Sequence, residues 1–172
     1  MKVIAINGSA RKNWNTHILL NKALEGAESA GARTELINLY DLDYKGCTGC
    51  LGCKVKESKT LGHCIVNDDL KSVLERIDKS DGLIMGSPIY PSEITAVLRA
   101  FWERFIFQYL NYEDYAKPLF SGNLKTAFIY TSNVGAGYYD DLLKKYETTL
   151  GSYFEYAGTL HSGETLQVDD YS

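Results

Sequence analysis

The sequence has few of the features that mark linkers, membrane spans and polyanion-binding surfaces. Its 172 residues include only three prolines and no repeat or low-complexity tract, so residues 1–172 are expected to form a single domain. The most apolar stretch, residues 94–110, is interrupted by charged and amide side chains and is not expected to cross a membrane. The net charge of −4 supplies no basic surface for nucleic acid. Four apolar residues after Lys2 are too few for a signal peptide, so we expect a cytoplasmic protein.

The composition is that of a globular protein, with 45% hydrophobic and 23% charged residues. Short apolar runs typical of strands alternate with longer runs of helical periodicity. The expected strands are residues 2–6, 34–39, 82–86, 125–131 and 154–160, and the expected helices are residues 16–30, 68–77, 94–110 and 139–150. Strands separated by single helices predict an α/β protein with a parallel sheet covered on both faces. We therefore expect a flavodoxin-like three-layer α/β/α domain with a five-stranded parallel sheet in the order 2-1-3-4-5.

The ends of these elements carry further signals. Thr16 is a suitable N-cap for the first helix, and Gly31 is a suitable stop. Only about a dozen residues follow the last expected strand, where this fold expects a closing fifth helix, and the residues from Gln167 onward are too few to form one. We expect that the C-terminal helix is missing and that the natural chain extends beyond Ser172.

The loop after the first strand, residues 7–16, is predicted to hold a phosphate group. It runs directly into a helix, whose N-terminus offers free N–H groups and a positive dipole end. Ser9, Asn15 and Thr16 add neutral donors, and Arg11 adds a charged one. The loop matches neither the nucleoside triphosphate P-loop nor the glycine fingerprint of dinucleotide binding. The alternative is an ordinary strand-to-helix turn rich in capping residues.

Two more loops follow the third and fourth expected strands, and we call them the third loop and the fourth loop. Residues 86–92 contain two prolines around Tyr90, which favours a stiff turn that could lie along a flat ring, or one whose tyrosine packs on a neighbour. Residues 131–138 are small and rich in glycine, which allows a ligand to approach the backbone closely. Loops that follow parallel strands meet at one edge of the sheet, so together they indicate a binding site.

All four cysteines fall within residues 47–64. Cys47, Cys50 and Cys53 are spaced by three, and Cys64 follows after ten intervening residues. This grouping is compatible with a [4Fe-4S] cluster. It is also compatible with a zinc site that uses four thiolates, or three together with His63, and with cysteines that bind no metal. The three histidines are scattered, so no catalytic triad and no catalytic residue is predicted.

The three loops and the cysteines resemble those of the flavodoxin-like NAD(P)H-dependent FMN reductases and, within them, the iron-sulfur flavoproteins. The resemblance runs from Met1 to about Leu160 and rests on residues 8–16, on residues 47–69 and on residues 87–90. It implies that the protein is an FMN-dependent oxidoreductase. The residues implied are Ser9, Arg11, Asn15 and Thr16 for the FMN phosphate, Pro88, Ile89 and Tyr90 for contact with the isoalloxazine, Ser132, Asn133, Gly135 and Gly137 for the border of the ring, and Cys47, Cys50, Cys53 and Cys64 as cluster ligands.

The sequence departs from the family pattern at two places. Trp14 stands where the motif usually has glycine, so the phosphate loop is expected to differ in shape or to use the indole against the flavin or a neighbouring subunit. The gap between Cys53 and Cys64 is longer than the usual spacing, and residues 54–62 are expected to bulge outward.

The leading hypothesis is electron transfer between a reduced donor, NAD(P)H or ferredoxin, and an acceptor through FMN and a [4Fe-4S] cluster. The acceptor is a small molecule or a protein. Alternatives are a cluster-free NAD(P)H-dependent flavin, quinone or azo-compound reductase, a flavin-binding electron carrier without turnover, and a zinc-stabilised interaction domain. The aromatic segment 101–110 indicates a subunit contact as well as a core, so a homodimer or homotetramer is expected.

Overall fold

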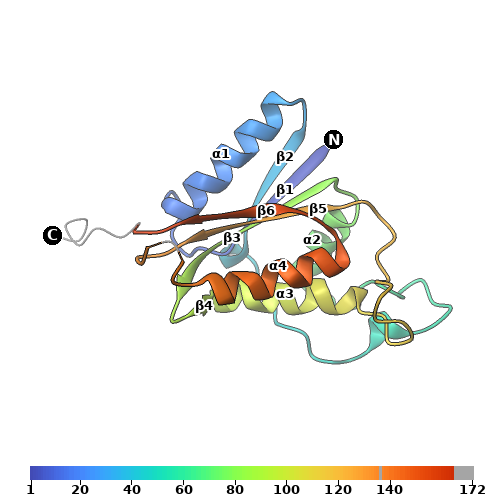
Figure 1. Cartoon of the computed structure of the whole chain (residues 1–172). Coiled ribbons are helices and arrows are strands. Elements are labelled where there is room, and N and C mark those ends of the chain that lie inside the picture. Colours follow the sequence, from blue (N-terminus) through green and yellow to red (C-terminus); the bar gives the residue numbers. More distant parts are fainter. Residues whose placement is uncertain (136, 165–172) are drawn as a thin grey trace.

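The computed structural model describes residues 1–135 and 137–164, which form one twisted sheet with helices on both faces (Figure 1). The five parallel strands are β1 (Lys2–Asn7), β2 (Arg33–Asn38), β3 (Gly82–Tyr90), β5 (Lys125–Thr131) and β6 (Glu155–Ser162). They lie in the order β2-β1-β3-β5-β6. Numbered along the chain without the short β4, this is the predicted order 2-1-3-4-5, and the predicted fold class is confirmed.

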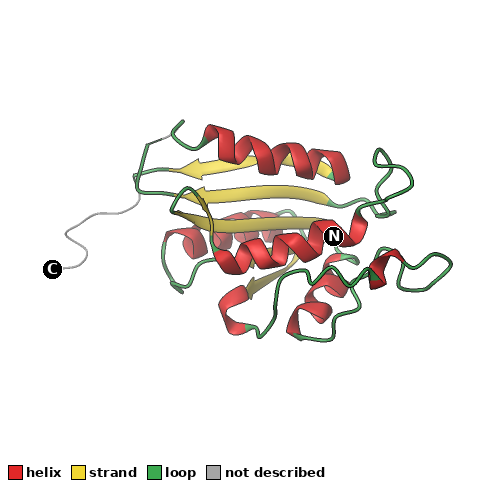
Figure 2. Ribbon diagram, turned by 90° about the horizontal axis from the view of Figure 1, so that it is seen from below, coloured by secondary structure: helices red, strands yellow, loops and turns green. Residues whose placement is uncertain are grey.

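The helices divide unequally between the two faces of the sheet. α1 (Asn15–Ser29) covers one face, and α2 (Asp69–Ile77), α3 (Ala96–Tyr109) and α4 (Asp140–Tyr153) cover the other (Figure 1). Seen from the α3 and α4 side, the helices lie along the strands, and the long loops gather beyond the ends of the strands (Figure 2).

The larger part of the core lies beneath α2, α3 and α4. Phe105 of α3 is fully buried and stacks on Phe101 and Phe154 with ring centroids 5.4 Å and 5.1 Å away. Its ring also forms a T-shaped pair with Tyr109. Much of the aromatic character of residues 101–110 is therefore explained by contacts within the chain.

The start of α1 differs from the prediction, whereas its end agrees. The helix begins at Asn15 with Trp14 as N-cap, so the prediction that Thr16 caps it is wrong. The Thr16 hydroxyl is buried and lies 2.8 Å from that of Thr131, because the fourth loop offers it a partner that the sequence does not reveal. The helix ends before Gly31, as predicted.

β3 is longer than predicted, and the expected stiff turn over residues 86–92 is largely strand. Residues 87 and 88 still pair with β5, and Ile89 and Tyr90 pair antiparallel with β4 (Glu93–Ile94). The turn is reduced to Pro91 and Ser92, and Ser92 has a φ of 57°. The short strand β4 was not predicted.

The predicted absence of a C-terminal helix concerns residues that lie outside the described part of the chain. Within residues 1–135 and 137–164, none of the helices combines the length and apolar character that crossing a membrane requires.

Candidate functional site

A cavity of about 410 Å³ lies at the carboxyl ends of β3 and β5, beside the N-terminus of α1. Its volume is within the usual range of sites for small ligands and cofactors. It is lined by Ser9, Arg11, Trp14, Asn15, Thr16, Pro88, Ile89, Tyr90, Pro91, Thr131, Ser132, Asn133 and Tyr139. The three loops singled out in the sequence therefore meet in one place, and we call this space the loop cavity.

A buried asparagine fixes the conformation of the first loop through hydrogen bonds. Asn7 is fully buried, and its Oδ1 accepts a hydrogen bond from the Ser9 backbone N–H at 3.0 Å. Its Nδ2 donates to Asn38 Oδ1 at 2.9 Å. The Ser9 hydroxyl in turn accepts from the Arg11 backbone N–H at 3.2 Å. These bonds fix the first turn of the loop before any ligand binds.

The loops are also joined to one another. The Gly8 N–H donates to the Gly86 carbonyl at 2.8 Å, and the Thr95 hydroxyl donates to the Gly8 carbonyl at 2.7 Å. The contact between Thr16 and Thr131 joins the first loop to the fourth. The loop cavity is thus built on the start of α3 and the ends of three strands.

The lining of the loop cavity combines one cation with several aromatic rings. Arg11 is the one charged side chain in this lining, and its guanidinium lies over the Trp14 ring at 4.7 Å. The Trp14 ring therefore packs against the guanidinium of Arg11. At the end of β2, burial and the neighbouring Tyr90 raise the pKa of Tyr40.

Most of the residues predicted for this site line the loop cavity, but Gly135 and Gly137 are not among its lining residues. Pro91, Thr131 and Tyr139 line it without having been predicted as ligand-binding residues, and Trp14, for which contact with the flavin was one of the expectations, lines it as well. The signal for Thr131 was its place as the last residue of an expected strand. His161 had no predicted role, yet its Nε2 lies 2.8 Å from the Ser132 hydroxyl.

The four cysteines line a second, much smaller cavity at the far end of α3, which we call the cysteine cavity. Cys53 is buried, Cys47 and Cys64 are half-buried, Cys50 is exposed, and all four are free thiols. Gly52 packs closely against Ile65, whose side chain would have to move to admit a Cβ at this position. The Gly62 N–H donates to the Cys53 carbonyl at 3.0 Å, so residues 54–61 leave the main path of the chain and return to it. This agrees with the outward bulge expected for residues 54–62.

The charges around the cysteine cavity act on the thiols. Burial raises the pKa of the Cys53 thiol, the adjacent Lys54 opposes this effect, and the nearby Cys64 and Cys47 raise it further. Burial lowers the pKa of Lys54. Cys47, Cys53 and Cys64 line the same cavity.

The cysteine cavity has the ligand types of a metal centre, but in the present geometry these ligands are not grouped around one position. Four thiols on one cavity match the ligands of an iron-sulfur cluster or of zinc. Arg104 Nε and Gln108 Nε2, on residues that line the same cavity, are buried without a hydrogen-bond partner among the described residues. However, no three His, Cys, Asp or Glu side chains in the described chain are grouped as ligands of one ion. The void is about 20 Å³, room for roughly one water molecule.

Comparison with known proteins identifies relatives of this chain. The sequence model of the NADPH-dependent FMN reductase family matches residues 1–145. An iron-sulfur flavoprotein of Methanocaldococcus jannaschii is 38% identical over 104 residues, which cover 60% of this chain and 51% of that protein. An iron-sulfur flavoprotein of Archaeoglobus fulgidus is 30% identical over 149 residues, which cover 84% of this chain and 63% of that protein. The chain spans about half the length of most of the curated relatives it matches.

Solved structures support the fold. The NAD(P)H:quinone oxidoreductase of Methanothermobacter marburgensis superposes with a TM-score of 0.77 at 17% identity, covering 99% of this chain and 90% of that one. A protein titled flavone reductase superposes with a TM-score of 0.72 at 18% identity, covering 99% of this chain and 57% of that one.

Proposed function

The chain belongs to the NADPH-dependent FMN reductase family, and from that premise we propose that it is an FMN-dependent oxidoreductase that binds FMN in the loop cavity. The observation that carries the proposal is the lining of this cavity, which joins the N-terminus of α1 and Arg11 to Pro88, Ile89 and Tyr90. A helix N-terminus with an arginine suits a phosphate, and a wall of proline and aromatic side chains suits a flat ring. FMN, when bound, supplies the chemistry of accepting a hydride or single electrons.

The residues of the chain have binding roles in this proposal. Ser9, Arg11, Asn15 and Thr16 hold the phosphate, and Pro88, Ile89 and Tyr90 lie against the ring. Ser132 and Asn133, with the backbone at Gly135 and Gly137, border the ring from the fourth loop. The bonds of Asn7 and Thr95 support this assignment, because they hold the phosphate loop in one conformation and reduce the ordering that binding requires. No side chain is assigned as an acid or base.

We further propose that Cys47, Cys50, Cys53 and Cys64 hold a [4Fe-4S] cluster. Three observations support this: the four thiols line one cavity, buried N–H groups nearby lack partners, and the curated relatives include proteins named iron-sulfur flavoproteins. Because the thiols are not grouped as ligands in the present conformation, they would have to rearrange around the cluster. NAD(P)H or ferredoxin is the proposed donor, a small molecule or a protein the proposed acceptor, and a cytoplasmic homodimer or homotetramer the proposed form of the protein.

A second candidate is a cluster-free NAD(P)H-dependent flavin or quinone reductase. The small volume of the cysteine cavity favours it, because a void of about 20 Å³ holds no cluster unless the thiols rearrange. The second candidate keeps the same flavin site and differs only in the cysteines.

The deciding experiment is an absorption spectrum of anaerobically purified protein, with iron and acid-labile sulfide measured on the same sample. Flavin bands with a broad shoulder and about four irons per chain would support both cofactors. Flavin bands without iron, bleached by NADH or NADPH, would support the second candidate, and flavin bands that neither nucleotide bleaches would indicate an electron carrier. A colourless sample that takes up no added FMN would overturn the proposal.

A matched pair of variants assigns the iron to the cysteines. Cys53→Ser should lose iron and keep FMN, whereas Ser58→Ala, in the same segment but outside the ligand set, should keep both. Equal iron in the two variants would remove Cys53 from the proposed ligands.

A further inference from the structure

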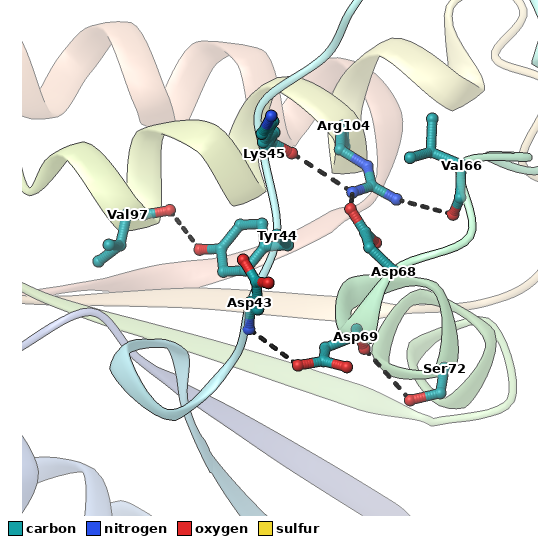
Figure 3. A network of polar contacts seen from close by, with 9 residues as sticks. All are labelled: Asp43, Tyr44, Lys45, Val66, Asp68, Asp69, Ser72, Val97 and Arg104. Atoms are coloured by element: carbon teal, nitrogen blue, oxygen red, sulfur yellow. Dashed lines mark hydrogen bonds and ion pairs between the residues drawn. The ribbon is translucent and has the colours of Figure 1, made fainter.

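A buried arginine connects α3 to the segment that carries the cysteines (Figure 3). The Arg104 side chain is 1% exposed, although a charged group is seldom buried so completely without a specific partner. Its Nη1 donates to the carboxylate of Asp68 and, at 3.3 Å, to the carbonyl of Lys45. Its Nη2 donates to the carbonyl of Val66 at 3.3 Å.

These acceptors stand at the two ends of the cysteine segment. Lys45 precedes Cys47 by two residues, and Val66 follows Cys64 by two residues. One planar guanidinium thus brings together backbone groups that are distant in sequence, and the cysteines lie between them. Lysine has no fork with which to make the same set of bonds at once.

Other contacts with α3 hold the interior of the segment. The Cys64 N–H donates to Gln108 Oε1 at 3.0 Å. The Lys54 ammonium donates to the carbonyls of Phe107, Gln108 and Leu110 at the end of the helix. The last turn of α3 therefore serves as the platform on which the cysteine segment is built.

The hydrogen-bonding capacity of Arg104 is not exhausted by these contacts. Its Nε is buried with no partner in the described part of the chain, and the Oδ1 of Asp68 is likewise unpaired. Arg104 also lines the cysteine cavity together with all four thiols. A buried donor without an acceptor is unfavourable, and a thiolate or sulfide in this cavity would supply the acceptor.

We infer that Arg104 is the positioning residue of the cysteine cavity, fixing both ends of the cysteine segment and presenting a positive charge and a hydrogen-bond donor to the sulfur atoms of the cluster. This inference rests on the cluster proposed above. Asp68 holds the guanidinium in place by accepting one of its hydrogen bonds. Arg104 is not among the residues that line the loop cavity, so its replacement is expected to leave FMN binding unchanged.

The test compares Arg104→Met, Arg104→Lys and the control Arg76→Met in the full chain. Arg76 is an arginine of α2 whose side chain is 41% exposed, in an ion pair with Glu35. For apoprotein titrated with cobalt(II), Arg104→Met should weaken binding by about 10- to 100-fold, the usual effect of losing a partner of metal ligands. Hydrogen exchange of residues 45–68 should become faster in Arg104→Met, and Arg76→Met should match the parent protein in both measurements.

The midpoint potential of the cluster shows whether Arg104 acts through its charge or only through its structural contacts. Reduction adds a negative charge to the cluster, so removal of a buried cation should lower the potential in Arg104→Met. Arg104→Lys keeps the charge and should shift the potential less, even where it binds cobalt(II) more weakly. If Arg104→Met fails to fold, the double variant Arg104→Met/Asp68→Leu removes the whole buried pair and takes its place.

The outcomes distinguish this inference from the cluster proposal. A parent protein that binds neither iron nor cobalt(II) would refute the cluster. Hydrogen exchange of residues 45–68 in Arg104→Met would then decide whether Arg104 positions the cysteine segment. Parent protein with a cluster, alongside an Arg104→Met variant with unchanged cobalt(II) affinity, potential and exchange, would overturn the inference and leave the cluster standing. FMN content should be equal in all variants, and its loss in Arg104→Met would also contradict the inference.

Discussion

Replacement of Gly86 by alanine tests whether α1 packs on β3 as closely as the structure indicates. A Cβ at this position would lie 2.6 Å from Leu20 Cδ1 and 2.9 Å from Thr16 Cγ2. Both neighbours belong to α1 and are buried, with side chains 0% and 2% exposed. Because neither can turn into solvent, α1 has to move away from β3.

The expected cost of Gly86→Ala is that of overpacking a core, about 1–3 kcal/mol of unfolding free energy. The displacement also moves Thr16, one of the proposed phosphate ligands, so FMN affinity should fall together with stability. Gly26→Ala is the matched control. Gly26 lies in α1, and a Cβ at this position would meet nothing within 4 Å. Alanine is the better helix former by about 1 kcal/mol, so this variant should be more stable than the parent protein and bind FMN equally well.

Urea unfolding followed by far-ultraviolet circular dichroism measures the first effect, and quenching of FMN fluorescence measures the second. The two substitutions are chemically identical, so opposite signs in the unfolding free energy would locate the cause in the surroundings of each glycine. A Gly86→Ala protein as stable as the parent, with unchanged FMN affinity, would refute the packing argument.

Three further predictions address other parts of the chain. Arg11→Ala should weaken FMN binding by about 1–2 kcal/mol, a factor of roughly 5–30, in fluorescence titrations, whereas Arg33→Ala, at the amino end of β2, should leave it unchanged. Phe105→Ala should lower the unfolding free energy by about 3–5 kcal/mol in urea, because a fully buried ring leaves a void that its neighbours cannot fill; a loss below 1 kcal/mol would contradict the buried stack. Burial alone would raise the pKa of Glu93, but hydrogen bonds, chiefly from Tyr146, outweigh it and lower that pKa. The stabilisation by Glu93 is therefore present at neutral pH and is lost as the pH falls through the folded-state pKa; Glu93→Gln should be less stable than the parent protein at pH 7, and the difference should vanish in acid, as thermal unfolding across a pH series would show.

The sequence predicts the sheet well because its strands are encoded locally. The limits of β5 were predicted to the residue, since an apolar run of strand type ends where the small residues of the fourth loop begin. The strand order was predicted from the number of strands alone, because five parallel strands suit the flavodoxin-like topology. The meeting of the three loops followed from the same geometry.

The remaining features depend on partners that are distant in sequence. Thr16 has the chemistry of a helix cap, and only the position of Thr131 across the cavity gives its hydroxyl another role. Pro88 suggested a turn, but β5 runs beside it and extends the strand. In the sequence, Arg104 is one polar residue of an apolar helix. The residues near it in the sequence do not reveal that the carbonyls of Lys45 and Val66 accept its hydrogen bonds.

The hydrogen bond between Gly62 and the Cys53 carbonyl has a consequence for how the cysteine segment tolerates changes in length. It closes the loop of residues 54–61 at its base, so residues inserted at the tip of that loop need not alter the distance between Cys53 and Cys64. The entropic cost of a longer flexible loop grows slowly, by about 0.6 kcal/mol for each doubling of its length. The number of residues between the third and fourth cysteines is thus a poor measure of whether they can act together. Insertions at the tip of this loop should be tolerated, provided that the base of the loop stays closed.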